Sequence, residues 1–138
     1  MFARQTYSIL IVTSLFFAGC GTDNPLNRQA VTGEITLGTA PLAQGSIEFT
    51  PKASGQASGA KIEDGKFSIP ADKGLPPGEY LVRISASDAT AEAVEMPGDS
   101  RAIAAELIPA QYNTDSTETF TVKAGEENVY KLIIEVPQ

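Results

Sequence analysis

The sequence contains no histidine, and this absence narrows the chemistry open to the protein. Histidine is the usual general base near neutral pH and the commonest ligand for zinc. No other set of residues in the sequence offers a nucleophile, a base and a stabilising group together. We therefore expect no catalytic residue, no metal site and no cofactor, and we expect the protein not to be an enzyme.

Cysteine is almost as scarce, with 1 residue in a chain of 138, so an internal disulfide is excluded. The chain does not need one. Its length falls in the usual range for one domain, and a domain of this size buries enough surface to fold without disulfide bonds.

Positive charge is the third scarcity, because 10 Lys and Arg face 17 Asp and Glu, a net charge of −7. The phosphates of nucleic acids and of anionic lipid headgroups repel such a protein. We expect no nucleic-acid partner, and we expect the acidic side chains to keep a tethered domain soluble.

Residues 1–19 have the composition of a bacterial export signal. Arg4 gives a positive start, and the apolar run of about ten residues that follows is well short of the ~20 that a membrane-spanning helix needs. The run ends in the small pair Ala18-Gly19, directly before Cys20. This ending resembles the lipobox of bacterial lipoproteins, although Phe17 stands where leucine is usual. The resemblance implies that Cys20 receives a lipid and becomes the first residue after cleavage.

Two alternatives for Cys20 remain open. The leader could be an ordinary signal cut near Gly19 with an incidental thiol, or it could be an uncleaved membrane anchor. A lipid explains better why a lone thiol is tolerated in an oxidising compartment. Two or more acyl chains, palmitate among them, hold a protein on a bilayer persistently. The expected location is the extracytoplasmic face of the cell membrane or outer membrane, with the membrane as partner through the lipid on Cys20.

After the leader, residues 20–29 are polar and lack an apolar period, which predicts a lipid-anchored tether, and residues 30–138 form the expected domain. From residue 31 the apolar period becomes two, which is typical of half-buried strands joined by Gly and Pro turns. Seven strands are predicted, over residues 31–37, 46–50, 60–63, 66–69, 80–85, 118–123 and 129–136.

Two predicted hairpins set the register. Asp64-Gly65 suits a two-residue turn with positive φ, which places Ile62 opposite Phe67, Ala60 opposite Ile69 and Glu63 opposite Lys66. Residues 124–127 are expected to join the last two strands as a hairpin loop. The inward side chains of these strands are expected to be Phe120, Val122, Tyr130, Leu132, Ile134 and Val136.

The alternation predicts an all-β fold, a seven-stranded antiparallel β-sandwich. Residues 86–117 interrupt it as one long irregular connection, the place where binding is most expected. Within it, Ser100 is expected to cap a short helix with Ile103 and Leu107 on one side, stopped by Pro109.

The segments VTGEITLGTAPLAQGSIEF, DGKFSIP and LPPGEYLVRIS resemble the carboxypeptidase regulatory-like, or transthyretin-like, sandwich domains. With the lipobox and the segment LIPAQYN, the chain is similar to small lipoproteins of planctomycete bacteria. The resemblance implies a fold and a location, because such sandwiches carry many unrelated functions. The hydrolases of 5-hydroxyisourate in this group depend on histidines and on a Tyr-Arg-Gly-Ser ending, and this chain has neither.

Tyr112 and Asn113 are the residues we single out for partner binding, because tyrosine offers a sugar or protein both an apolar face and a polar tip. The alternative is that Ile108 and Tyr112 pin the connection to the sandwich. Two interpretations are open for Glu34 and Glu48: their side chains lie on a solvated face of the sheet, or they form the carboxylate pair of a glycosidase. For Glu63-Asp64-Gly65, a turn explains the sequence better than a calcium loop.

The sequence thus favours a non-catalytic structural or binding module of the cell envelope, with an envelope protein or a glycan as its further partner. The alternative function is a carbohydrate-binding or carbohydrate-processing envelope protein.

Overall fold

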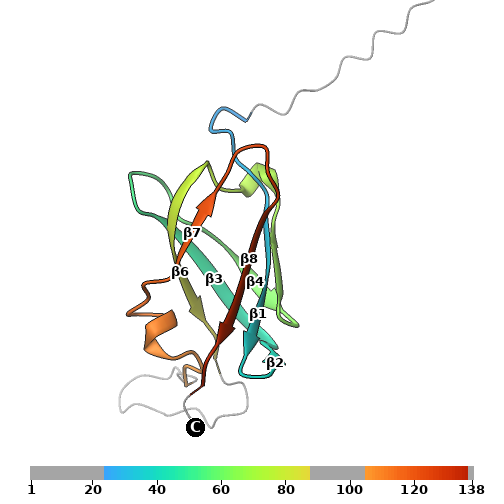
Figure 1. Cartoon of the computed structure of the whole chain (residues 1–138), viewed down its shortest axis with the longest axis vertical. Coiled ribbons are helices and arrows are strands. Elements are labelled where there is room, and N and C mark those ends of the chain that lie inside the picture. Colours follow the sequence, from blue (N-terminus) through green and yellow to red (C-terminus); the bar gives the residue numbers. More distant parts are fainter. Residues whose placement is uncertain (1–23, 88–104, 137–138) are drawn as a thin grey trace, which may run out of the picture.

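The computed structural model describes residues 24–87 and 105–136 as an all-β domain (Figure 1). The strands are β1 (Val31–Leu37), β2 (Ala40–Pro41), β3 (Gln44–Pro51), β4 (Ser58–Glu63), β5 (Lys66–Ile69), β6 (Gly78–Ser85), β7 (Thr119–Val122) and β8 (Asn128–Ile134). Two single-turn 3-10 helices complete it, η1 (Ala71–Lys73) and η2 (Ala110–Tyr112). The seven predicted strands are all present, and β2 is an addition. The expected signal-peptide helix lies outside the described residues.

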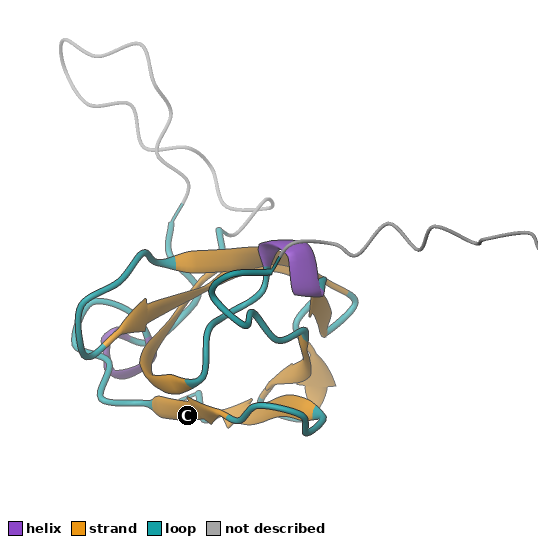
Figure 2. Cartoon of the chain, turned by 90° about the horizontal axis from the view of Figure 1, so that it is seen from above, coloured by secondary structure: helices purple, strands orange, loops and turns teal. Residues whose placement is uncertain are grey.

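The strands form one curled sheet in the order β2-β1-β5-β4-β3-β6-β7, and β8 pairs with β1. Viewed from above, the strands surround a single interior (Figure 2). Every pairing is antiparallel except that of β8 with β1, which is parallel over seven registered residue pairs. The expected purely antiparallel arrangement is therefore wrong at this edge.

Strand β1 shows why the apolar alternation is a reliable signal. Val31, Gly33 and Ile35 are buried, whereas Thr32 and Glu34 are exposed, because successive side chains of a strand point to opposite faces. Gly33 has a specific reason to lack a side chain. A Cβ there would lie 2.1 Å from the carbonyl oxygen of Tyr130. The close approach of β8 to β1 requires glycine at this position.

The Asp64-Gly65 turn is confirmed, with φ values of 50° and 75°. Of the three residue pairs predicted across this turn, only Glu63 with Lys66 is observed. The predicted pairs Ile62–Phe67 and Ala60–Ile69 are wrong, although three of these side chains are buried in the core and Ala60 packs against it. Each of the two strands forms more residue pairs with a different strand. β4 forms six registered pairs with β3, and β5 forms four with β1. The two strands separate directly after the turn.

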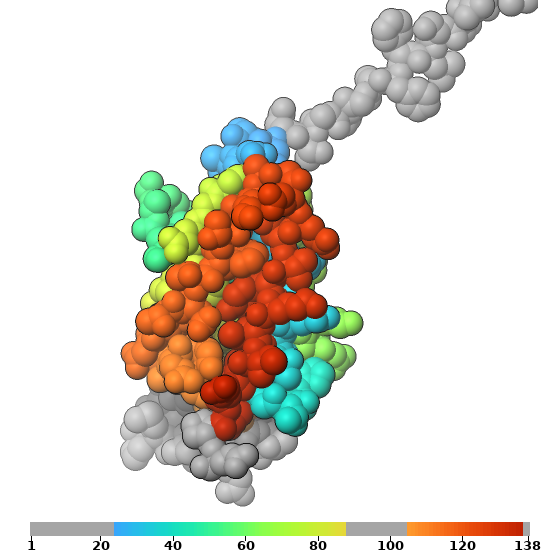
Figure 3. All heavy atoms as spheres, viewed as in Figure 1, coloured from blue at the N-terminus to red at the C-terminus, as the bar shows by residue number. Residues whose placement is uncertain are grey.

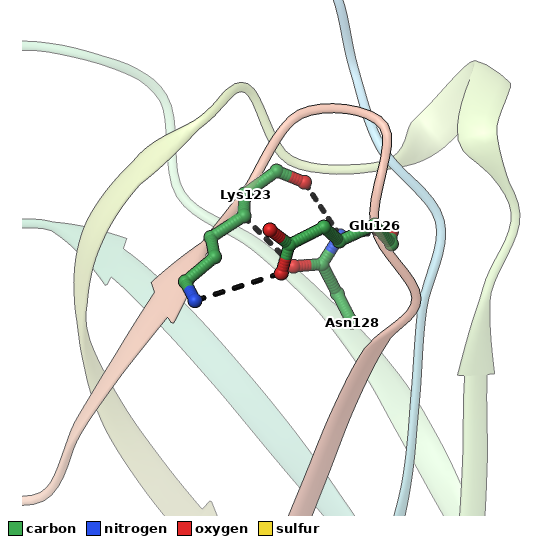
Figure 4. A network of polar contacts seen from close by, with 3 residues as sticks. All are labelled: Lys123, Glu126 and Asn128. Carbon is green, nitrogen blue, oxygen red and sulfur yellow. Dashed lines mark hydrogen bonds and ion pairs between the residues drawn. The ribbon is translucent and has the colours of Figure 1, made fainter.

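The predicted hairpin over residues 124–127 is also wrong, because β7 pairs with β6 while β8 pairs with β1. A side chain closes this connection instead. The Oδ1 atom of Asn128 accepts a hydrogen bond from the Lys123 N–H at 2.8 Å. Its Nδ2 atom donates to the carbonyl oxygens of Lys123 and Glu126 at 3.0 and 3.1 Å (Figure 4). Asn128 is buried, and it supplies the polar contacts that a hairpin ladder would have made.

An aromatic cluster shows that the curled sheet encloses one core. The ring of Phe49 on β3 lies 5.9 Å from that of Phe67 on β5, 6.0 Å from Phe120 on β7 and 6.1 Å from Tyr130 on β8. Strands from the middle and the edges of the sheet thus meet through their side chains. Val136 does not join them: it follows the end of β8 and is 48% exposed, so the prediction that it faces inward is wrong.

The described end of the long connection is not helical at residues 105–108. The N–H of Leu107 donates to the carbonyl oxygen of Ala86 at 2.8 Å, beside an isolated bridge between Ser87 and Glu106. Leu107 is exposed and Ile108 is buried in its place, which contradicts the predicted helix face. Ser100 and Ile103, the other residues of that prediction, lie outside the described residues.

Candidate functional site

The domain has two distinct ends, and candidate functional residues lie at both. In the space-filling view, residues 24–29 (blue) lie at the upper end, and the segment around η2 (orange) lies at the lower end (Figure 3). Strand β6 also ends near this lower end (Figure 1), and Ser87, just beyond β6, forms an isolated bridge with Glu106. Residues 24–29 thus lie at one end of the domain, and the described residues that flank the long connection lie at the other.

Cys20 lies outside the described residues, but the expected tether of residues 20–29 is folded at the upper end from Asn24 onward. The side chain of Asn24 accepts a hydrogen bond from the Arg28 N–H at 2.8 Å and donates to the Arg28 carbonyl at 2.9 Å. Gln29 then forms a two-way backbone bridge with Leu75, at 2.8 and 3.1 Å. Residues 24–29 are part of the folded domain, which leaves only Gly21, Thr22 and Asp23 between them and Cys20.

At the lower end, the two residues predicted to bind partners occupy different surroundings. Tyr112 ends η2 and packs, half-buried, against the core. Ile108, just before it, is 4% exposed. This packing agrees with the alternative prediction that Ile108 and Tyr112 pin the connection to the sheet. Asn113 is also half-buried, and its side chain helps to lower the pKa of the Glu106 carboxyl.

Glu106 is the polar centre of this end, and sequence reasoning missed it. Its carboxylate accepts hydrogen bonds from the Ser85 hydroxyl at 2.5 Å and from the N–H groups of Ala86 and Ile108 at 2.7 and 3.1 Å. Burial acts to raise the pKa of Glu106, but these bonds, together with the Asn113 side chain, outweigh burial and hold the pKa below its ordinary value of 4.5. The carboxylate thereby joins the end of β6 to the connection. The only signal in the sequence was a single acid between Ala105 and Leu107.

Beside Glu106, a shallow hollow of about 460 Å³ lies on the outer face of β3 and β6. Its polar lining consists of Ser46, Glu48, Arg83, Ser85, Asn113 and Thr114. Hydroxyl, amide, carboxylate and guanidinium groups therefore surround one space, a combination that suits a polar ligand. Tyr112 does not line it, and no other aromatic side chain among residues 24–87 and 105–136 does.

The other acids proposed from the sequence lie on solvated surfaces. Glu34 pairs with Lys131 at 3.1 Å on the exposed face of β1 and β8. Glu48 accepts a hydrogen bond from Thr50 at 3.1 Å on β3. Asp64 lies in its turn. Across residues 24–87 and 105–136, no group of three or more His, Cys, Asp or Glu side chains is arranged to hold a metal ion.

No helix in the described part of the chain has the length and apolar character needed to cross a membrane. The chain matches no protein-family model, none of the curated proteins and no solved structure. The function must therefore be argued from the residues themselves and from the geometry of the two ends.

Proposed function

We propose that this protein is a lipid-anchored, extracytoplasmic β-sandwich that acts as a non-catalytic structural or binding module of the cell envelope. The observation that carries the proposal is the separation of the two ends (Figure 1). Residues 24–29 lie at one end of the domain, and the described residues that flank the long connection lie at the other. A lipid on Cys20 places the first end at the bilayer and leaves the second end free to contact a partner.

The pairing pattern supports the sandwich architecture. β4 and β5 share a single registered pair, Glu63 with Lys66, at the only junction between two groups of strands. One group contains β2, β1, β5 and β8, and the other contains β4, β3, β6 and β7. The groups pack together through Phe49, Phe67 and Tyr130. Two layers around one core are what the carboxypeptidase regulatory-like resemblance implies.

The role of Glu106 supports a module rather than an enzyme. A catalytic acid needs free access to a substrate and a pKa near the working pH. The carboxylate of Glu106 instead receives hydrogen bonds from several groups of the protein, and its pKa is lowered. We assign to Glu106 the task of fixing the connection at the end of β6.

Mass spectrometry of the protein purified from its native membranes tests the anchor. We expect a peptide that begins at Cys20 and carries the mass of a diacylglyceryl group, with or without a further acyl chain. The intact protein should enter the detergent phase on phase separation, and Cys20→Ser should stay unprocessed or remain in the aqueous phase. A native peptide with a free Cys20 thiol, or one that begins at Met1, contradicts the proposal.

A glycan is a second candidate ligand, favoured by the polar hollow beside Asn113. Titration of the lipidated protein in detergent with soluble peptidoglycan fragments and neutral oligosaccharides, followed by NMR, tests it. Arg83→Ala and Thr114→Ala should each weaken binding about tenfold, since each removes a polar contact. Lys131→Ala, on the opposite layer, should bind normally. Titration without shifts at the hollow contradicts glycan binding there.

A further inference from the structure

The segment Asn24–Arg28, called here the foot turn, is rigidly built although it lies next to the lipid-bearing residue. Besides the two hydrogen bonds between Asn24 and Arg28, the N–H of Asn27 donates to the Asn24 carbonyl at 3.0 Å. Asn27 adopts a positive φ of 50°, which asparagine tolerates better than most residues. The foot turn therefore has a defined shape.

The foot turn is also fixed to the domain through Gln29. Beyond the bridge to Leu75, the Gln29 Oε1 atom accepts a hydrogen bond from the Gly125 N–H at 3.2 Å, in the loop between β7 and β8. Gly74, after η1, makes room for this packing, because a Cβ there would lie 2.0 Å from the Gln29 carbonyl oxygen. The foot turn and the sheet consequently move as one body.

The surface of the foot turn is apolar at its tip and positively charged beside it. Leu26 is 54% exposed. It lines an open hollow of about 670 Å³ together with Arg28 and with Asp72 and Lys73 of η1. The lining that the described residues provide thus carries two cations against one anion, in a protein whose net charge is −7. An exposed leucine beside two cations matches the layer where lipid chains meet phosphate groups.

The distance to the bilayer is set by covalent geometry. Only Gly21, Thr22 and Asp23 separate Cys20 from Asn24. Four Cα steps span at most about 14 Å even when fully extended. The headgroup layer on each side of a bilayer is itself roughly 5–8 Å thick. A lipid on Cys20 therefore holds the foot turn within reach of the phosphates at all times.

We propose that the foot turn docks on the bilayer in which Cys20 is anchored, with Leu26 in the interfacial layer and Arg28 and Lys73 on phospholipid phosphates. This inference rests on the proposed lipid anchor. The contact can be weak and still be occupied, because a short tether raises the effective concentration to the millimolar range. Its consequence is orientation: the domain stands on its upper end, and the connection near Glu106 points away from the membrane.

The absence of tryptophan from the sequence makes the test direct. Leu26→Trp introduces the only indole of the protein at the tip of the foot turn. Ile133→Trp is the matched control, since Ile133 is 66% exposed on β8 near the opposite end. Each lipidated variant is reconstituted into vesicles of phosphatidylethanolamine and phosphatidylglycerol that contain a lipid brominated near the headgroup. Urea unfolding first checks that both variants keep the wild-type stability.

We expect Leu26→Trp to emit at shorter wavelength in vesicles than in detergent and to be quenched at least twofold by the brominated lipid, with little change for Ile133→Trp. Adding Arg28→Ala and Lys73→Ala to Leu26→Trp should reduce the quenching. Equal quenching of the two indoles contradicts the docking. A shift of the Leu26→Trp emission to shorter wavelength without quenching by the brominated lipid would assign the foot turn to a contact with a second copy of the protein, and it would also overturn the inference.

Mass spectrometry of the same samples separates the two proposals. A lipidated Cys20 with an unquenched Leu26→Trp leaves the anchor in place and refutes the docking alone. An unmodified Cys20 refutes both, because the foot turn is then not held at the bilayer.

Discussion

The buried hydroxyl group of Tyr130 allows a specific test of how the core contributes to stability. Tyr130 is 6% exposed, and its Oη atom has no hydrogen-bond partner among the described residues. A buried polar group without a partner costs about 1–3 kcal/mol. Tyr130→Phe removes this cost and keeps the ring contacts with Phe49 and Phe120, at 6.1 and 5.3 Å between centroids. The small void left by the oxygen costs only a few tenths of a kcal/mol.

We therefore expect Tyr130→Phe to raise the free energy of unfolding by about 1–2 kcal/mol. For a domain of this size each kcal/mol corresponds to roughly 4–8 °C in Tm. Urea denaturation monitored by circular dichroism measures the change directly.

Tyr80→Phe is the matched control, with the opposite sign. Tyr80 is equally buried, at 4% exposure, but its hydroxyl donates to the Pro76 carbonyl at 2.7 Å. Losing that bond should lower the free energy of unfolding by about 0.5–1.5 kcal/mol. If Tyr130→Phe destabilises the protein as Tyr80→Phe does, the Tyr130 hydroxyl has a partner and the reasoning fails.

The pH dependence of the free energy of unfolding gives a second test of the buried Tyr130 hydroxyl. Burial, and then the charges of Glu118 and Tyr112, raise the pKa of Tyr130 above its ordinary value of 10.0. Above about pH 10 the unfolded chain loses this proton while the folded protein keeps it, so stability falls as the pH rises, by up to about 1.4 kcal/mol per pH unit. Tyr130→Phe should flatten this alkaline slope, and an unchanged slope contradicts the assignment.

Three further substitutions test other parts of the domain by urea denaturation. Gly33→Ala should destabilise it by about 3 kcal/mol or prevent folding, since the added Cβ meets the Tyr130 backbone; wild-type stability would refute that tight approach. Asn128→Ala should cost about 2 kcal/mol, whereas Lys123→Met, which breaks only an exposed ion pair, should cost less than about 0.5; equal losses would refute the role of Asn128. Glu106→Gln should lower stability at pH 7 but little at pH 3, because a depressed pKa stabilises the fold only above about 4.5; equal losses at both pH values would contradict the carboxylate's role.

The local structure was largely predictable because it depends on neighbours in the sequence. Alternating apolar residues identified all seven major strands, and Asp64-Gly65 identified its turn from the need for positive φ. The same local signals failed where the alternation continued beyond the end of a strand. Val136 continues the period of β8 but lies beyond the last residue that pairs with β1. The pattern itself carried no information about where the partner strand ended.

Strand partners and polar contacts between distant segments depended on the tertiary structure. The sequence predicted hairpins between consecutive strands, but β5 and β8 both pair with β1, since this encloses the aromatic side chains in one core. Glu106 gains its role only because the connection brings it back to Ser85 at the end of β6, 21 residues away in the chain.

The sequence by itself determined that the chain forms strands, which faces of them are apolar, and that a cysteine follows a leader-like segment. The tertiary structure alone decided that residues 24–29 belong to the domain, that they lie at the end opposite η2, and that β8 runs parallel to β1. Strand formation and facing depend on the order of side chains along the backbone. Pairing and the placement of the two ends depend on contacts between residues far apart in the sequence, and no local pattern encodes them.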